Sequence, residues 1–128
     1  MVRRLCLVTG ASAGIGAAFA RVFAARGYEL ALTARRADRL EALADEIGDR
    51  SGVRPLVIAA DLADPAAPDA ILKAIADAGK QVDALVNNAG YGLPGAYAKT
   101  SWEDQAAFIQ VLATAPAALA HKVLPGML

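Results

Sequence analysis

Thr9-Gly10-Ala11-Ser12-Ala13-Gly14-Ile15-Gly16 joins the apolar run at residues 5–8 to a segment with helical spacing of apolar residues at 17–23. A strand, a glycine-rich turn and a helix in this order are typical of a backbone that binds a nucleotide phosphate. Gly10 permits a tight turn, Gly14 lets the backbone approach a pyrophosphate, and Gly16 allows close packing of the helix on the sheet. The helix then directs its free N–H groups and positive dipole end at the anion.

The spacing of these glycines narrows the class of nucleotide site. It is Gly-x-x-x-Gly-x-Gly and not the Gly-x-Gly-x-x-Gly of the ordinary dinucleotide fingerprint. No Gly-Lys-Ser or Gly-Lys-Thr completes the turn, which argues against a P-loop NTPase. Glycines that simply end a strand are the alternative interpretation.

A second motif, Asn87-Asn88-Ala89-Gly90, follows the apolar run at residues 84–86. The two motifs in this order resemble the cofactor site of the short-chain dehydrogenase/reductase family, and the resemblance covers residues 2–128. The Gly-x-x-Gly-x-x-Gly of the family's extended epimerase and dehydratase branch does not fit. The resemblance implies a Rossmann fold and hydride transfer between a nicotinamide cofactor and a small-molecule carbonyl or alcohol substrate.

Composition favours one α/β domain over residues 1–128, because 56% of the chain is hydrophobic with few aromatic residues. Thirteen basic and thirteen acidic residues cancel, so neither nucleic acid nor an anionic membrane is an expected partner.

We expect no membrane span of ~18 apolar residues and no metal site. Glycine and polar residues interrupt the N-terminal apolar region, which argues against a secretion signal. The single cysteine, Cys6, is expected to be buried as a small hydrophobe, which is compatible with a cytoplasmic protein.

The alternation of strand-like and helix-like segments predicts a Rossmann-like, doubly wound parallel sheet with helices on both faces. Expected strands cover residues 4–8, 29–33, 54–59 and 84–87, and expected helices cover 15–26, 38–47, 66–78 and 100–123. The strand order of a dinucleotide fold makes these four strands 3-2-1-4, with strands five and six missing. Phe19, Val22 and Phe23 are predicted to form one face of the first helix. Pro116 is predicted to kink or locally adjust the last helix.

The end of the second expected strand bears on the choice of cofactor. A carboxylate about 20 residues after the glycines binds the ribose hydroxyls of NAD. Ala34 stands near that position, and Arg35 and Arg36 follow it. A guanidinium pairs with a 2′-phosphate through two parallel hydrogen bonds. We therefore predict NADP, with NAD as the alternative, against the interpretation that both arginines are merely solvated.

The resemblance implies further cofactor contacts. Asp61 would contact the adenine amino group with Leu62 beside it, although Asp61 alone also suits a loop cap. Residues 88–90 would lie along the adenine ribose, although Asn88 also suits stabilisation of a strand end. Ser12 and Ile15 would line the phosphate loop. The predicted cofactor-binding residues are Gly10, Ser12, Gly14, Ile15, Gly16, Arg35, Arg36, Asp61, Leu62, Asn88, Ala89 and Gly90.

The chemistry of the family requires a serine and a Tyr-x-x-x-Lys motif, in which the tyrosine is the general acid/base. Neither Tyr28, Tyr91 nor Tyr97 has a lysine four residues later. In the family these groups follow a fifth strand, which this sequence does not reach. We therefore predict no catalytic residue in these 128 residues and no activity of the chain alone. The alternatives are a non-catalytic nucleotide-binding module and a truncated remnant.

Leu112 departs from the family, which usually has asparagine at this position. The apolar stripe Phe108, Leu112, Ala115 and Leu119 is therefore interpreted as core or subunit contact. We expect a homo-oligomer, and an open edge at the fourth strand predicts that the isolated chain dimerises or aggregates.

Overall fold

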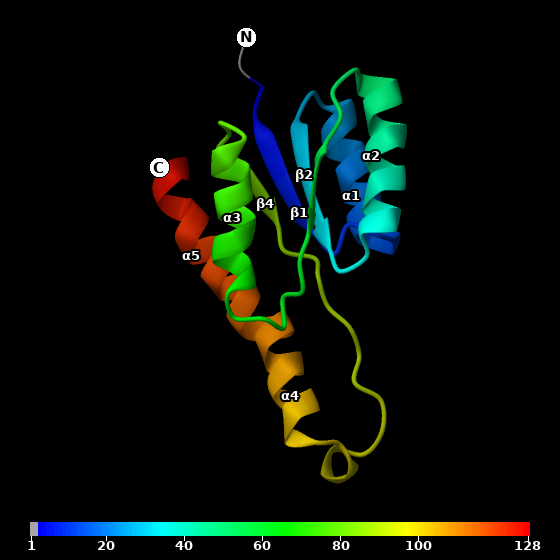
Figure 1. Cartoon of the computed structure of the whole chain (residues 1–128), viewed down its shortest axis with the longest axis vertical. Helices are drawn as coiled ribbons and strands as arrows, with labels where there is room; N and C mark the ends of the chain where they lie inside the picture. Colours follow the sequence, from blue (N-terminus) through cyan, green and yellow to red (C-terminus); the bar gives the residue numbers. More distant parts are fainter. Residues whose placement is uncertain (1–2) are drawn as a thin grey trace.

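Four short parallel strands form the sheet in the computed structural model, which describes residues 3–128 (Figure 1). The strands are β1 (Leu5–Thr9), β2 (Glu29–Ala34), β3 (Leu56–Ala59) and β4 (Ala84–Val86). Their order is β3-β2-β1-β4, so the predicted order 3-2-1-4 is confirmed. Leu7 pairs with Ala31 on one side and with Leu85 on the other. The reversal of strand order therefore falls between β1 and β4.

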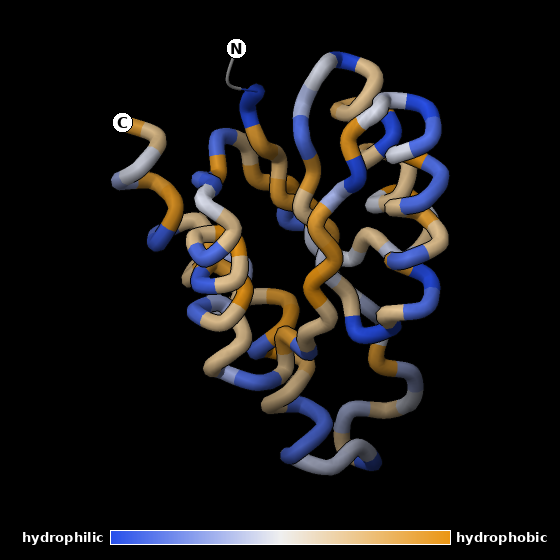
Figure 2. Tube along the Cα trace, turned by 45° about the horizontal axis from the view of Figure 1, so that its top comes forward, coloured by the Kyte–Doolittle hydropathy of each residue, from blue (hydrophilic) through white to orange (hydrophobic). Residues whose placement is uncertain are grey.

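Helices cover both faces of this sheet, as predicted (Figure 1). One face carries α1 (Gly14–Ala25) and α2 (Ala37–Ser51), which pack on alternate strand residues such as Val8 and Leu32. The other face carries α3 (Ala67–Asp77) and α5 (Ala115–Met127), which pack on the intervening residues such as Leu7 and Ala31. Figure 2 shows apolar segments in the middle of the domain and hydrophilic residues recurring along the helices that flank them. Alternation of side chains along each strand thus builds two apolar layers.

Small residues form the buried face of α1, namely Gly16, Ala17 and Ala20. The predicted face of Phe19, Val22 and Phe23 lies beside it. Phe19 and Val22 are 42% and 49% exposed, and Phe23 is partly buried with its ring edge-on to Tyr28 at 5.0 Å. Small side chains let the helix axis approach the strands closely, and this turns the larger side chains outward.

The C-terminal helical region is interrupted by a π turn. α4 (Trp102–Ile109) begins at Ser101, whose side chain accepts a hydrogen bond from the backbone N–H of Asp104 at 3.0 Å. The π turn η2 (Gln110–Thr114) then leads into α5, and Pro116 lies in the first turn of α5. Proline has no backbone N–H, and a π turn is one way to relieve the lost helical bond. The predicted local adjustment at Pro116 is confirmed.

This region also corrects the expectation about apolar length. Trp102–Met127 is a helix long and apolar enough to cross a membrane, with a mean hydropathy of 1.4. A core helix of a globular domain meets the same criteria of length and composition. Ala115, Leu119 and Val123 of α5 are buried in the layer shared with α3, and 22% of the most apolar 18-residue stretch of this helix is buried.

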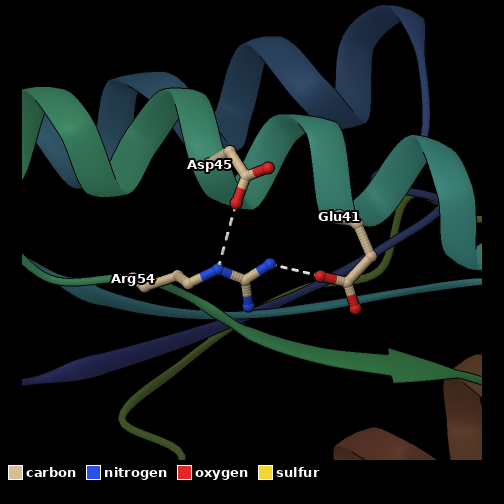
Figure 3. A network of polar contacts seen from close by, with 3 residues as sticks. All are labelled: Glu41, Asp45 and Arg54. Atoms are coloured by element: carbon tan, nitrogen blue, oxygen red, sulfur yellow. Dashed lines mark hydrogen bonds and ion pairs between the residues drawn. The ribbon is translucent and has the colours of Figure 1, made fainter.

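An ion-pair network ties the segment before β3 to α2. Arg54 donates from Nε to Asp45 Oδ1 at 3.2 Å and from a terminal nitrogen to Glu41 (Figure 3). Exposed pairs of this kind contribute little to stability. Arg54 is thus an arginine whose charge is balanced by carboxylate partners.

Cys6 gives a pH-dependent prediction. It is fully buried in β1, as expected, and burial raises the pKa of its thiol from 9.0 to about 12. Below pH 9 the thiol is protonated in both folded and unfolded chains, so its contribution to stability is constant there. Between pH 9 and about 12 only the unfolded chain ionises, and stability falls by up to about 1.4 kcal/mol per pH unit. Urea denaturation of the wild type and Cys6→Val across this range measures the effect. Identical slopes in the two proteins would contradict it.

Candidate cofactor site

A crevice of about 700 Å³ opens at the carboxyl end of the sheet. Its walls come from the turn after β1, the end of β2 and the segments that follow β3 and β4. α4 and the loop before it extend beyond this end of the sheet (Figure 1). Ligands of open α/β sheets bind at such a position, outside the strand ends where the strand order reverses.

The two sequence motifs are joined beneath this crevice. Thr9 Oγ1 accepts hydrogen bonds from the backbone N–H groups of Asn88 and Ala89, both at 3.0 Å, and donates to the Val86 carbonyl at 3.4 Å. The Asn88 side-chain amide donates to the carbonyls of Thr9 and Gly10 at 3.3 and 3.2 Å. Asn88 therefore stabilises the strand end, which was the alternative interpretation, and also holds the glycine-rich turn in place.

Glycine is required in the turn for steric reasons. Gly10 has a φ of +63°, and a Cβ there would lie 2.9 Å from the Cα of Ala89. A Cβ at Gly16 would overlap the carbonyl oxygen of Gly10. The turn, the start of α1 and the segment after β4 thus meet with no room for a side chain.

The start of α1 provides free donors. α1 begins at Gly14, the residue before it makes no side-chain capping hydrogen bond, and the first turn contains no acidic residue. The first backbone N–H groups of a helix have no partner within the helix. An anion in the crevice is therefore the partner that these groups and the helix dipole favour.

Three arginines line the other end of the crevice. Arg35 and Arg36 were predicted, and Arg39 in the first turn of α2 joins them. Within residues 3–128 none of these three forms an ion pair, whereas Arg21 and Arg54 do. The start of a helix disfavours cations. Placing three guanidinium groups there without carboxylate partners therefore creates a site suited to an anion. Arg39 follows Arg36 by three residues, a spacing that places two side chains side by side at a helix start. This spacing could have indicated Arg39 from the sequence.

The loop after β3 forms the wall near these arginines. Asp61 Oδ1 accepts a hydrogen bond from the backbone N–H of Ala63 at 3.0 Å, so Asp61 caps its loop. Asp61 and the buried Leu62 also line the crevice. The two interpretations of Asp61 are compatible, because a carboxylate has a second oxygen that accepts hydrogen bonds.

All predicted cofactor residues except Gly14 and Gly16 line the crevice, and these two glycines belong to the turn and helix start beside it. Sequence reasoning missed the remaining lining residues, which are Ala13, Thr33, Ala34, Arg39, Ala60, Ala63, Ala107 and Val111. Tyr91 lines the crevice as well, with its ring 5.4 Å from that of Phe108. Most of the missed residues are small or apolar and carry no chemical signal in sequence. Leu112 lies against Gly90, where an added Cβ would stand 2.9 Å from its Cδ2.

The sequence profile described as short chain dehydrogenase matches residues 4–128. The chain belongs to the short-chain dehydrogenase family. Sulfoacetaldehyde reductase of Chromohalobacter salexigens is 38% identical over 122 residues, which are 94% of this chain and 47% of that protein. An NADP-dependent 3-hydroxy acid dehydrogenase of Salmonella typhi is 37% identical over 96% of this chain and 48% of that protein.

Solved structures of the same family superpose closely on the chain. L-sorbose reductase of Gluconobacter frateurii, complexed with NADPH and L-sorbose, has a TM-score of 0.91 at 35% identity. That match covers 99% of this chain and 48% of the reductase. The chain thus spans about half the length of the relatives that it matches.

The residues present fit a phosphorylated dinucleotide. The glycine-rich turn and the uncapped start of α1 suit a diphosphate, and the three arginines suit a further phosphate. The buried hydroxyl of Thr33, which also lines the crevice, has no hydrogen-bond partner. Across residues 3–128, no group of three or more His, Cys, Asp or Glu side chains is arranged to hold a metal ion.

Proposed function

We propose that this chain is the NADP(H)-binding half of a short-chain oxidoreductase that acts on the carbonyl or alcohol group of a small molecule. The observation that carries the proposal is the group of three arginines without ion-pair partners beside the glycine-rich turn. The NADPH complexes of related structures support the same cofactor. NAD is the alternative, which lacks the phosphate that these arginines would bind.

Each part of the crevice has a proposed role. The N–H groups at the start of α1 hold the diphosphate. Arg35 and Arg36 hold the 2′-phosphate, with Asp61 and Leu62 beside the adenine and residues 88–90 along its ribose. The bound nicotinamide supplies or accepts the hydride. The chain's own contribution is to bind and orient the cofactor, because no Tyr-x-x-x-Lys motif occurs in its sequence.

We further propose that the chain alone does not turn over substrate, and that the protein is cytoplasmic. Binding without turnover is also what a non-catalytic nucleotide-binding module would show, whereas a remnant would bind no cofactor. Fluorescence titration with NADPH, paired with an assay of NADPH oxidation on a small ketone, separates a binding module from a remnant. Turnover by the chain alone would contradict this part of the proposal.

Arginine substitutions test the choice of cofactor. We expect Arg35→Ser and Arg36→Ser each to weaken NADPH binding by about 10- to 100-fold, because each removes a charge-assisted hydrogen bond of about 1.5–3 kcal/mol. NADH binding should change little, since NADH lacks the 2′-phosphate. Titration of reduced-nicotinamide fluorescence measures both affinities.

The matched control is Arg50→Ser, an exposed arginine in the last turn of the same helix α2 and outside the crevice. It should leave both affinities unchanged. Tighter binding of NADH than of NADPH by the wild-type chain would overturn the assignment of NADP.

A further inference from the structure

Thr33, near the end of β2, carries a buried hydroxyl with no hydrogen-bond partner. Its residue is 1% exposed, and its Oγ1 is the one buried side-chain nitrogen or oxygen atom in residues 3–128 without a partner. A buried hydroxyl that makes no hydrogen bond lowers the stability of the folded chain. Such an exception in an otherwise satisfied interior calls for a physical reason.

Neighbouring groups leave this hydroxyl unpartnered. Thr33 is in register with Thr9 on β1 and with Ile58 on β3. The Thr9 hydroxyl is already engaged with Val86, Asn88 and Ala89. Ile58 offers no polar side-chain atom. The Thr33 carbonyl, by contrast, accepts a hydrogen bond from the Ala11 N–H at 3.2 Å, so the backbone of Thr33 helps to anchor the glycine-rich turn.

Thr33 is one of the residues that line the crevice. Side chains alternate along a strand, so Thr33 shares the sheet face of Ala31, which is the face that packs on Leu62 and Val111. Thr33, Leu62 and Val111 all line the crevice. Thr33 lies one residue before Ala34 and the arginines that follow it, and so on the side proposed for the adenosine half of the cofactor.

We propose that the Thr33 hydroxyl is a hydrogen-bonding contact for the adenosine half of the cofactor, made directly or through one ordered water. This inference rests on the proposed NADP(H) binding. The hydroxyl both donates and accepts, so it suits a ring nitrogen, an amino group or a bridging water. Thr33 is then a binding residue whose hydrogen bond is completed only when the crevice is filled. The Thr33 hydroxyl therefore destabilises the unliganded chain and increases its affinity for the cofactor.

Replacement of Thr33 by valine should act in opposite directions on stability and binding. Valine keeps the shape and removes the unpartnered hydroxyl, so we expect the melting temperature of the unliganded chain to rise by about 3 °C. The dissociation constants for NADPH, NADH and adenosine 2′,5′-bisphosphate should each rise about 3- to 10-fold, as loss of one hydrogen bond implies. Thr33→Ser retains the hydroxyl and should bind all three within a factor of about 2 of the wild type.

Thermal melts without ligand and fluorescence or calorimetric titrations measure these quantities on the same samples. Unchanged affinity in Thr33→Val would overturn the inference while leaving the proposed function intact. Equal losses in Thr33→Val and Thr33→Ser would overturn it by attributing the effect to packing. A lower melting temperature in Thr33→Val would overturn it by showing that the hydroxyl has a partner in the unliganded chain. Failure of the wild type to bind any of the three ligands would refute the proposed function and this inference together.

Discussion

Gly16→Ala is expected to abolish measurable NADPH binding and to lower the free energy of unfolding by about 3 kcal/mol. The added Cβ would overlap the carbonyl oxygen of Gly10 and lie 2.6 Å from Nδ2 of Asn88. Backbone and a hydrogen-bonded amide surround it, so relief requires the glycine-rich turn to move away from the segment after β4. That movement would separate the two motifs that form the crevice.

The direction of the change in unfolding free energy distinguishes a steric effect of the added Cβ from an effect of helix propensity. Alanine in place of a helical glycine ordinarily stabilises by about 1 kcal/mol, and here the steric term must exceed that gain. Gly92→Ala is the matched control, because its φ is not in the left-handed region and nothing lies within 4 Å of an added Cβ. Urea denaturation and fluorescence titration measure the two properties. A Gly16→Ala chain as stable as wild type would show that the turn relaxes at low cost.

The alternation of strands and helices and the glycine-rich turn were predictable because their signals are local, and the sheet order then followed from the dinucleotide fold that they indicate. Apolar runs of strand length alternate with helical spacing, and a short connection between such elements leaves few topologies. The buried face of α1 was not predictable in the same way. Phe19 and Val22 share a helical face with Phe23, and spacing marks that face as apolar without saying what covers it. The small residues Ala17 and Ala20 carry a weaker signal, and they form the contact.

The residues of the candidate site likewise fall into those that the sequence indicated and those that only the structure revealed. Arg35 and Arg36 were found because they stand beside the position at which a dinucleotide fold places its ribose-binding carboxylate, whereas Asp61 was found through the family resemblance. Thr33 was missed because a threonine in an apolar strand is ordinary until its hydroxyl is seen to lack a partner. Val111 reaches the crevice from η2, more than 70 residues after β2, so only tertiary packing brings it there.

The isolated 128-residue chain is expected to form dimers or larger assemblies. Ile15, Phe19 and Val22 lie four and three residues apart on one face of α1 and are 68%, 42% and 49% exposed. β4 pairs only with β1 and leaves its other edge free within residues 3–128. An apolar helix face and an unpaired strand edge both favour association. Size-exclusion chromatography with light scattering measures the mass.

Substitutions on α1 identify the surface responsible. Phe19→Gln combined with Val22→Gln removes apolar area without touching the buried residues of α1, so we expect the measured mass to fall toward that of a monomer. Ile109→Gln is the matched control, because Ile109 is 46% exposed on α4, away from α1. A monomer after Ile109→Gln alone would assign the contact to α4. A wild-type chain that is monodisperse, monomeric and melts cooperatively would contradict the prediction and favour a self-contained nucleotide-binding module.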